Sequence, residues 1–486
     1  MQLTYIAAIQ MFIGFVILLN GSLRSAFTFL LVSSLFAASA SIILPGLGGS
    51  SIPPVEIALI FVYLHIFGSR AGYLNVLSEA VRANRWLVVF TLFGIASAML
   101  APRIFADRIA VAPMRPIAHG QLVETVMLAP TAQNTTTAFY LAGTLLVALA
   151  AYVLCRACRG GIAALVETVI VIGWAHVITG IITLLAKGTP LDSIIDLVRN
   201  GSYAQLDQSY QGFVRIRGLF PEASAYAEFG IGYMVINAEL WYRSIRPGAT
   251  GTVAFALAVV LAFSTSSTAY VGLLGYGLFF VGRVFVMPRV VEGRRVKQFA
   301  AAAFGIIVLL AIVMALVPAM PVEFWNMILQ MTVGKSGSVS GVQRWFWATQ
   351  GWEAFKASSG LGIGPGSFRS SGLFFAILGS TGVIGIVSFL AYLADVFQPL
   401  RRSTWGQGRS LEQSIGGAFG TAAVLALIPA AVSSAKADPG VIFAFLSGAA
   451  LALRPLVRTK AGEHHERPAA LAASGEFTGE GEVQFR

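Results

Sequence analysis

Long apolar blocks recur along this chain and limit its fold more than any other feature. They are roughly 17–25 residues long, the length at which an α-helix crosses the hydrocarbon core of a bilayer. Backbone groups inside lipid must be hydrogen-bonded within their own segment, so helices are the expected form of these blocks. A membrane β-barrel would show shorter stretches of alternating polarity. We therefore predict an all-α polytopic integral membrane protein with about 12–14 transmembrane helices.

The composition agrees with this fold class. Only 11% of the 486 residues are charged, 56% are hydrophobic, and the mean hydropathy is +0.77. A soluble domain carries about 25% charged residues, so this chain has too few charges to cover a surface that faces water. The first block has no basic residues before it, and we interpret it as a retained span rather than a signal peptide. The expected spans are 4–20, 26–44, 55–67, 86–101, 136–155, 162–186, 223–242, 249–263, 268–287, 299–318, 372–398, 415–433 and 440–453.

Basic residues predict the orientation. The net charge is +11, and most Lys and Arg residues fall in one set of mostly short loops and in the C-terminal tail. The positive-inside rule places this set in the cytoplasm, so the charge reports topology rather than nucleic-acid binding. We expect a transmembrane domain over 1–460 and a disordered cytoplasmic tail over 461–486. The large extracytoplasmic loops are expected at about 102–135, 187–222 and 319–371.

The loop 187–222 carries basic residues on the side where the orientation rule predicts few. Arg215 and Arg217 precede an expected helix start at which Pro221 and Glu222 suit the first turn. A guanidinium near a helix N-terminus favours phosphate groups. Contact with lipid headgroups is the alternative for the two arginines, and a simple helix-start role is the alternative for Glu222.

The loop 319–371 contains a second group. Trp345, Trp352 and Phe355 fall at helical spacing and predict an aromatic helix at the membrane surface, with Arg344 beside it. This helix is either an interfacial anchor or the wall of a site for a lipid carrier. A Gly-rich turn follows from Gly360 and lets the backbone approach a ligand closely. It lacks the Lys-Ser/Thr pair of a nucleotide-binding loop.

Two further features bear on the chemistry. The turn 264–270 is rich in hydroxyls, which bond either to their own backbone or to sugar hydroxyls. The outer loops contain no Asp-x-Asp pair and no His cluster, so we expect no catalytic metal and no cofactor. Cys155 and Cys158 stand at a helix end, where ordinary small residues are the simpler interpretation than a redox pair.

At these residues the sequence resembles the O-antigen polymerase and O-antigen ligase superfamily of bacterial cell-envelope glycosyltransferases. Three patches carry the resemblance, in the family's order, over about 212–390. They are Arg215-x-x-Gly-x-Phe-x-Glu222-x-Ser224, the hydroxyl-rich turn from Phe263 to Gly272, and the stretch with Arg344, Trp347, the glycines from Gly360, Arg369 and then Gly382 and Gly385.

The departures from the family's pattern distinguish its two activities. Ala223 stands where Pro is usual, and Ser267 stands where ligases often have Arg. Ser370 and Ser371 fall where ligases place a His. The missing Arg and His favour a polymerase of exopolysaccharide, capsule or O-antigen over a ligase.

The resemblance implies a GT-C-like helical scaffold and a metal-independent, inverting polysaccharide polymerase in the bacterial inner membrane, where the positive-inside rule places the C-terminus in the cytoplasm. Its substrate would be an undecaprenyl-pyrophosphate-linked oligosaccharide, and its partners a repeat-unit flippase and a chain-length regulator. A hydroxyl of one unit would attack the anomeric carbon of the growing chain, and the lipid pyrophosphate would leave. Cations would stabilise the developing negative charge. An O-antigen-type ligase, or a transporter or flippase, is the alternative function.

We therefore predict Arg215, Arg217 and Arg344 as the stabilising cations, and Glu222 as the group that orients or deprotonates the acceptor. The predicted substrate-binding residues are Arg369, Ser224, Tyr226, Ser266, Trp345 and Trp352.

Overall fold

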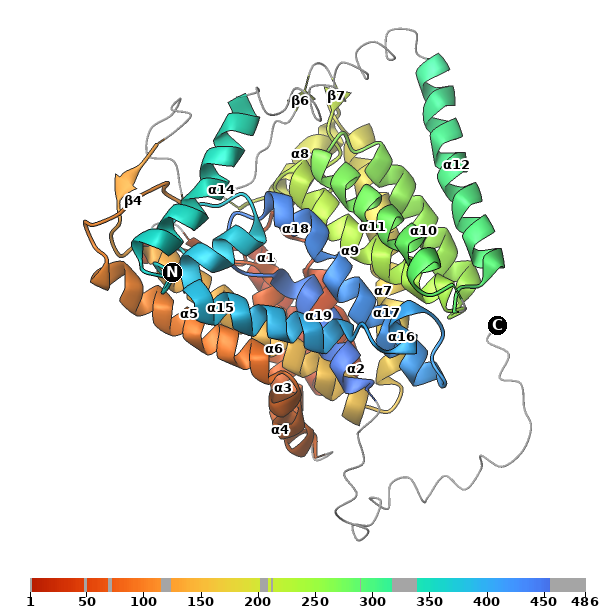
Figure 1. Ribbon diagram of the computed structural model, residues 1–486, viewed down its shortest axis with the longest axis horizontal. Helices are drawn as coiled ribbons and strands as arrows, with labels where there is room; N and C mark the ends of the chain where they lie inside the picture. Colours follow the sequence, from red (N-terminus) through yellow and green to blue (C-terminus); the bar gives the residue numbers. More distant parts are fainter. Residues whose placement is uncertain are drawn as a thin grey trace.

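The computed structural model describes residues 2–47, 50–68, 72–114, 124–201, 209–210, 213–288, 290–316 and 339–454. Helices dominate these residues (Figure 1). The first half contains α1 Tyr5–Asn20, α2 Leu23–Ser33, α3 Pro54–Gly68, α4 Tyr73–Ala83, α5 Arg85–Ile104, α6 Ala132–Ala157, α7 Gly161–Leu185 and α8 Pro190–Val198. The second half contains α9 Ala223–Tyr242, α10 Pro247–Ala262, α11 Ser267–Val286, α12 Gly293–Leu316, α14 Val339–Ala357, α15 Leu373–Phe397, α16 Arg402–Trp405, α17 Leu411–Leu425, α18 Leu427–Ser433 and α19 Gly440–Ala452.

The strands are only two or three residues long and lie in connecting segments. They are β1 Gln2–Leu3, β2 Ile42–Leu44, β3 Ser50–Ile52, β4 Ala110–Val111, β5 Val126–Met127, β6 Ser209–Tyr210 and β7 Phe213–Val214. They pair antiparallel in the orders β1-β2-β3, β4-β5 and β6-β7, with Ile42 opposite Ile52 in the first sheet. A short 3-10 helix, Pro45–Leu47, separates β2 from β3.

Within the described residues, seven helices are long and apolar enough to cross a membrane, and five shorter apolar helices accompany them. The long ones are α5, α6, α7, α11, α12 (over Gly293–Val313), α15 and the pair α17–α18; the shorter ones are α1, α2, α3, α10 and α19. The chain is thus an all-α multi-pass membrane protein. The predicted count of 12–14 spans and the GT-C-like scaffold stay predictions.

Two expected spans differ from the helices. The span predicted over 26–44 is too long, because α2 ends at Ser33 and 42–44 form strand β2. The hydroxyl-rich stretch after Ser33 bonds elsewhere: Ser41 donates its hydroxyl to Gln10 of α1, and its backbone N–H to Ile52. The span 415–433 bends between α17 and α18, where Pro429 lacks an N–H and its ring crowds the carbonyl four residues earlier.

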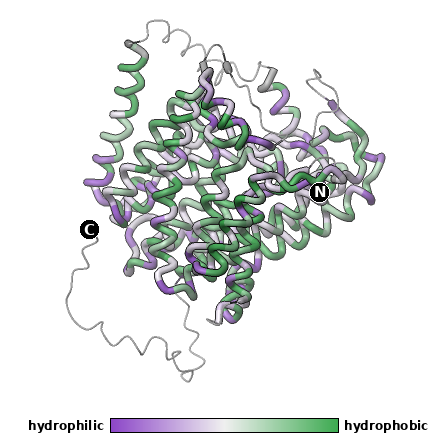
Figure 2. Tube along the Cα trace, turned by 180° about the vertical axis from the view of Figure 1, so that it is seen from behind, coloured by the Kyte–Doolittle hydropathy of each residue, from purple (hydrophilic) through white to green (hydrophobic). Residues whose placement is uncertain are grey.

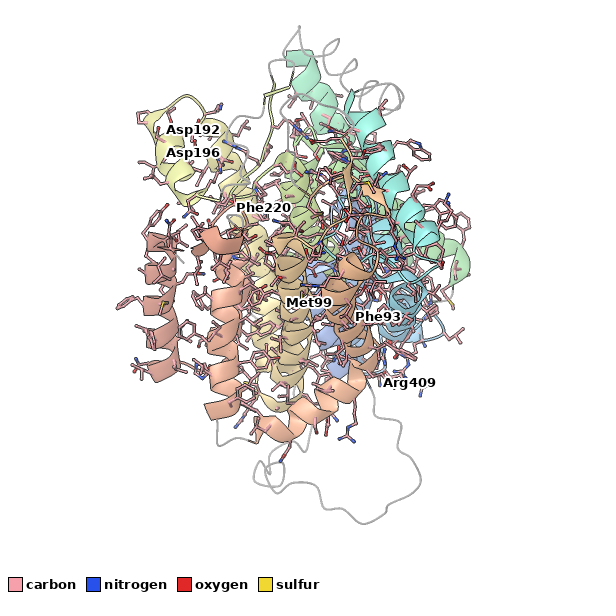
Figure 3. All side chains as sticks on the ribbon, turned by 90° about the vertical axis from the view of Figure 1, so that its left-hand side faces the viewer. Phe93, Met99, Asp192, Asp196, Phe220 and Arg409 are labelled. Carbon is pink, nitrogen blue, oxygen red and sulfur yellow. The ribbon has the colours of Figure 1, made fainter. Side chains whose placement is uncertain are left out.

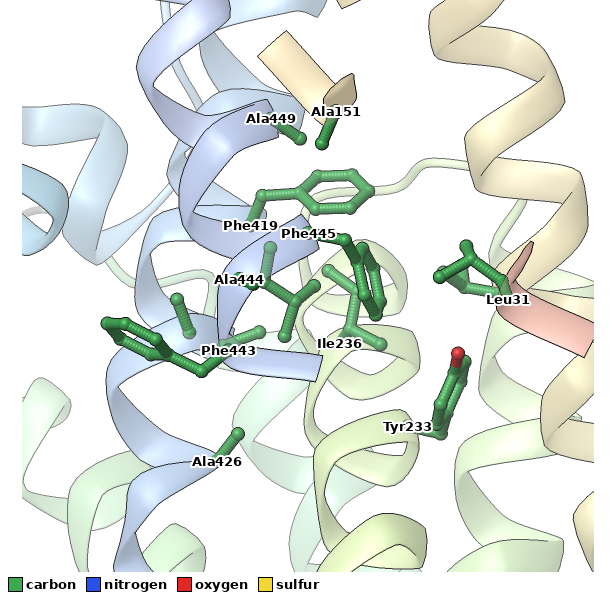
Figure 4. Packing of buried hydrophobic residues seen from close by; sticks show 14 of the residues in the cluster. Leu31, Ala151, Tyr233, Ile236, Phe419, Ala426, Phe443, Ala444, Phe445 and Ala449 are labelled. Carbon is green, nitrogen blue, oxygen red and sulfur yellow. The ribbon is translucent and has the colours of Figure 1, made fainter. Parts of the chain in front are cut away.

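Helix α9 lies at the centre of the bundle and is buried along nearly its whole length. It packs against α7, α10, α11, α17, α18 and α19. Figure 4 shows Tyr233 and Ile236 of α9 facing Phe445 of α19, and the ring centres of Tyr233 and Phe445 lie 6.0 Å apart. Because protein rather than lipid surrounds α9, this helix tolerates polar residues such as Glu228 and Glu239 better than a lipid-facing span would.

The two ends of the bundle differ in charge. The connections α6–α7, α9–α10, α11–α12 and α15–α17 lie at one end, which we name the basic end. Their described basic residues are Arg156, Arg159, Arg243, Arg246, Arg294, Arg295, Lys297, Arg401, Arg402 and Arg409. Figure 2 shows hydrophobic residues along the helices and hydrophilic ones gathered toward their ends. Helix α9 begins at the opposite end, as do α11 and α15. The predicted tail 461–486 lies outside the described residues.

Candidate functional site

A polar cavity of about 260 Å³ opens at the end of the bundle where α9 begins. Four segments that are distant in sequence meet there: the residue before α9, the helix α14, the residues before α15, and the end of α18 with the loop after it. The lining residues are Glu222, Gln343, Arg344, Trp347, Arg369, Ser370, Ser371, Ser433 and Ala435. The cavity therefore brings together three of the predicted site residues: Glu222, Arg344 and Arg369.

A glycine-rich segment, 360–366, fixes the position of Arg369. Four of its glycines have positive φ, namely Gly360, Gly362, Gly364 and Gly366. At Gly362 φ is +83°, and a Cβ atom would lie 2.5 Å from the backbone of Ser380. Only glycine fits such a conformation and approach. The sequence predicted a close approach of this backbone to a ligand, whereas the approach in the structure is to the backbone of Ser380 and Thr381.

The glycine segment also forms hydrogen bonds with the backbone groups that a break in α15 leaves unpaired. Gly382 has φ +56° and ψ −150°, so the helix is interrupted there. The amides of Ile363 and Gly364 donate to the carbonyls of Gly379 and Ser380 at 2.9 Å, and Val383 donates to Gly360 at 2.9 Å. These bonds replace those that the helix loses. The result is a rigid support that ends three residues before Arg369.

Helix α14 sits on α15 through small residues. A Cβ atom on Gly351 would lie 2.2 Å from the carbonyl oxygen of Phe375. A Cβ atom on Gly379 would in turn lie 2.6 Å from the carbonyl oxygen of Gly351. Ser371 donates its hydroxyl to the carbonyl of Arg344 at 2.5 Å. This contact holds the start of α14 against the segment before α15, so that Arg344 and Arg369 line the same cavity.

The charges of the cavity are not neutralised. Neither Arg344 nor Arg369 forms an ion pair with another described residue, and the Nε of Arg369 is buried without a hydrogen-bond partner. The guanidinium of Arg369 lies 4.2 Å from the centre of the Trp347 ring. Burial lowers the pKa of Arg369 and neighbouring Arg344 lowers it too, while Glu222 acts in the opposite direction. Two cations and one carboxylate make this cavity suited to an anion.

Glu222 is the N-cap residue of α9, as the predicted helix start requires, but its side chain does not cap the helix. Its carboxylate accepts a hydrogen bond from the hydroxyl of Ser224 and faces the cavity. Ser224 itself is buried and contacts the site through Glu222. Deeper in α9, Glu228 accepts from the hydroxyl of Ser433 at 3.4 Å, so a hydroxyl of the cavity wall touches a second carboxylate.

Arg217 lies outside the cavity wall. It is buried and pairs with Asp196 of α8 at 3.7 Å. Arg199 also pairs with Asp196, at 3.0 Å, and donates to the carbonyl of Gly218 at 3.1 Å. Figure 3 places Asp192 and Asp196 on the same outlying helix, α8, at the opposite end of the molecule from Arg409. These contacts give Arg217 a role in fastening α8 to the segment before α9.

Arg215 lies beside the hydroxyl-rich turn. It interacts electrostatically with Tyr270 in the first turn of α11. In that turn Ser264 donates to the carbonyl of Leu261 at 2.7 Å, as local bonding predicts. The buried hydroxyls of Thr265, Ser266, Thr268 and Tyr270 have no hydrogen-bond partner within the part of the chain that the structure describes. Thr265 has φ +50°, which is uncommon outside glycine. The predicted residue Ser266 is thus an unsatisfied buried hydroxyl outside the cavity wall.

The three predicted aromatic residues do not line the cavity. Tyr226 is buried, donates its hydroxyl to the carbonyl of His176 at 3.0 Å and stacks on the His176 ring at 3.8 Å. Trp345 is 74% exposed on α14, and Trp352, on the same helix, is 47% exposed and stacks on Phe355. The helical spacing that predicted α14 is confirmed, but the tryptophan that reaches the cavity is Trp347.

Several cavity residues carried no role in the sequence-based prediction. Trp347, Ser370 and Ser371 stand in the family-like stretch without having been assigned to the site. Ser433 and Ala435 come from α18 and its following loop, more than 200 positions from Glu222, and no local pattern marks them. The charge pattern indicated Arg215 and Arg217, whereas Arg344 and Arg369 were predicted with the aromatic helix and the family-like stretch. Serine and alanine near a span end are ordinary.

In the described part of the chain, no group of three or more His, Cys, Asp or Glu side chains is arranged to hold a metal ion. Comparison with protein-family models, with curated proteins and with solved structures finds no match to this chain.

Proposed function

We propose that this protein is a membrane glycosyltransferase that polymerises oligosaccharide units carried on undecaprenyl pyrophosphate, at the outer face of the bacterial inner membrane. One observation supports this proposal above the others. Arg344 and Arg369 line one cavity with Glu222, and neither arginine is neutralised by an ion pair among the described residues. Such a cavity suits a diphosphate together with an acceptor hydroxyl.

The proposed roles follow from the contacts. Arg344 and Arg369 would bind the diphosphate and stabilise its negative charge as it leaves the anomeric carbon. Glu222 would accept the proton of the attacking hydroxyl, and Ser224 would orient its carboxylate. Arg215, beside the hydroxyl-rich turn, would contact the substrate outside this cavity. Arg217 would act only by positioning the segment before α9.

The test is Arg344→Ala, examined in cells that depend on this protein for their surface polysaccharide. We expect normal membrane insertion but loss of long chains, because removing one well-placed donor costs about 10²–10³ in rate. The readouts are the polymer length distribution on gels and the amount of lipid-linked single units. Lys356→Ala is a matched control on the same helix, since Lys356 is exposed, pairs with Glu353 and lies outside the cavity.

Normal polymer length in the Arg344→Ala strain would refute the site. Deletion of the gene separates the alternatives. Loss of a polymerase leaves single repeat units, whereas loss of a ligase leaves long polymer on its lipid carrier. Movement of units across reconstituted liposomes without chain extension would indicate a transporter instead.

A further inference from the structure

A second and larger cavity, of about 780 Å³, lies beside α1, and nothing in the proposed function uses it. It is a groove between α1 and α2, with further contributions from α3, α7 and α8. It shares no lining residue with the cavity of Arg344 and Arg369. In Figure 3, α1 is the outermost helix on the side toward Asp192 and Asp196.

The walls of the groove are aliphatic and aromatic. Ile9, Ile13 and Ile17 line it from α1, and Phe29 and Val32 line it from α2. Ile9 remains 56% exposed although α2 faces it across the groove. Such walls accept a hydrocarbon chain and offer nothing to a polar ligand.

Gln10, Thr28 and Ser33 are polar side chains of the groove wall, and each already has a hydrogen-bond partner in the protein. The amide nitrogen of Gln10 donates to the hydroxyl of Ser33 at 3.1 Å and to the carbonyl of Pro54 at 3.0 Å. The amide oxygen of Gln10 accepts from the hydroxyl of Ser41 at 2.7 Å. Gln10 therefore ties α1 to α2 and to the neighbouring segments. Its amide needs no hydrogen bond from a molecule in the groove.

At the basic end the groove becomes polar and positive. Ser22, Arg24 and Ser25 line it there. Arg24 is exposed and forms no ion pair with a described residue, and its guanidinium lies beside Gly160 in the connection between α6 and α7. The same residues form the N-terminus of α2, where the hydroxyl of Ser22 accepts from the amide of Ser25 at 3.5 Å and the amides before it have no acceptor within the helix. A cation and a helix N-terminus together favour a phosphate group.

We propose that the groove binds an anionic phospholipid, with an acyl chain between α1 and α2 and its phosphate on Arg24 and the N-terminus of α2. The combination of a hydrocarbon slot with one charged end matches an amphiphile. A helix from a second copy of this chain would fill the slot but would leave Arg24 without a counter-charge. The proposal does not rest on the proposed glycosyltransferase activity, because Arg24 lies at the end of the bundle opposite Glu222.

The lipid would act as a structural element. Helix α1 contacts the bundle chiefly through α3, and at its other end the hydroxyl of Tyr5 donates to the carbonyl of Leu197. A chain held in the groove would add contacts along the face of α1 that meets no protein, and would stabilise the folded state in proportion to occupancy.

The test uses the full-length protein, purified in mild detergent and stripped of lipid, then supplied with phosphatidylglycerol or phosphatidylcholine. Native mass spectrometry counts the lipids retained, and thermal unfolding measures stabilisation. We expect retention and stabilisation with phosphatidylglycerol, and clearly less of both with phosphatidylcholine. This comparison needs no variant. Equal retention of the two lipids would overturn the assignment of a phosphate site.

Variants then locate the site. Arg24→Gln is expected to weaken phosphatidylglycerol retention about fivefold, the effect of one basic residue on an anionic lipid. Arg24→Lys should keep most of it. Ala164→Trp, from α7, fills the groove and should reduce retention of both lipids. Arg409→Gln is the control, because Arg409 is exposed near the same end and outside the groove.

Unchanged retention in Arg24→Gln, or in Ala164→Trp, would overturn the proposal. So would a covalent dimer formed through Ile13→Cys in the membrane, because a second copy would then occupy the groove. Polymer length should be normal in all of these variants, so failure of this proposal and failure of the proposed function are separate results.

Discussion

One glutamate and two arginines lie at each end of α9. At one end they are buried and paired with each other, and at the other end they line an open cavity. At the basic end Glu239 meets Arg243 and Arg283, and at the other end Glu222 shares a cavity with Arg344 and Arg369. Arg283 donates to both carboxylate oxygens of Glu239, at 2.8 and 2.7 Å, and Arg243 donates to one of them. All three side chains of this inner cluster have no exposed surface.

Further contacts seal the inner cluster. The hydroxyl of Tyr276 donates to Glu239 at 3.1 Å. Arg243 also donates to the carbonyls of Ser403 and Thr404, at 2.9 and 2.8 Å, which ties α9 to α16. The guanidinium of Arg283 lies 4.3 Å from the centre of the Tyr242 ring. Arg369 also lies over a ring, that of Trp347, but among the described residues neither cavity arginine has an ion pair, which leaves their charge for a ligand. Arginine and glutamate therefore act as structural residues where they are buried and paired, and they can bind a ligand where they line an open cavity.

The largest expected effect tests the sealed cluster. Glu239→Gln leaves Arg243 and Arg283 buried without their counter-charge. Breaking a buried ion pair in this way costs about 3–5 kcal/mol of folding free energy. We expect a strongly lowered unfolding temperature in detergent and a reduced yield of folded protein.

The matched control is Glu167→Gln, since Glu167 pairs with Arg246 at an exposed position, where such pairs contribute under about 1 kcal/mol. If Glu239→Gln were no less stable than Glu167→Gln, the inner cluster would not be a stabilising element and the contrast between the two ends of α9 would fail.

The next effect concerns the open cavity. Arg369→Gln removes a cation that has no ion-pair partner among the described residues, so we expect a change in stability of less than about 1 kcal/mol. Chain extension should fall by about 10²–10³, as for loss of one charge-stabilising donor. Comparing unfolding temperature with polymer length separates the two. A large loss of stability with normal polymer would make Arg369 structural, like Arg283.

The smallest expected effect tests whether Trp347, whose ring lies against the guanidinium of Arg369, contributes to the site. Trp347→Leu removes a cation–π contact that contributes about 0.5–2 kcal/mol. We expect binding of inorganic pyrophosphate to the purified protein, measured by calorimetry, to weaken several-fold. Trp345→Leu is the control, because Trp345 is exposed on the same helix and lies outside the cavity. Equal effects of the two substitutions would remove Trp347 from the site.

Sequence patterns located some of the site and missed the rest. Arg344, Arg369 and Glu222 were predicted from the family-like stretches, with an aromatic helix beside Arg344 and a helix start at Glu222. Arg217 was predicted because basic residues in outer loops run against the usual topology, yet it pairs with Asp196, a contact between segments that no spacing reveals. Ser433 was not predicted, because it reaches Glu228 only through the packing of α18 on α9.

The sequence by itself determined that this protein is a helical multi-pass membrane protein, because lipid requires long apolar segments whose backbone is bonded internally. The sequence also marked the glycine-rich segment 360–366 as a place of close backbone approach, but it did not show what the backbone approaches. Only the tertiary structure decided that the glycines of 360–366 pack on a break in α15, and that Glu222 faces a cavity while Glu239 is sealed. Long-range packing decides which charges find partners, and that packing is not encoded in any local pattern.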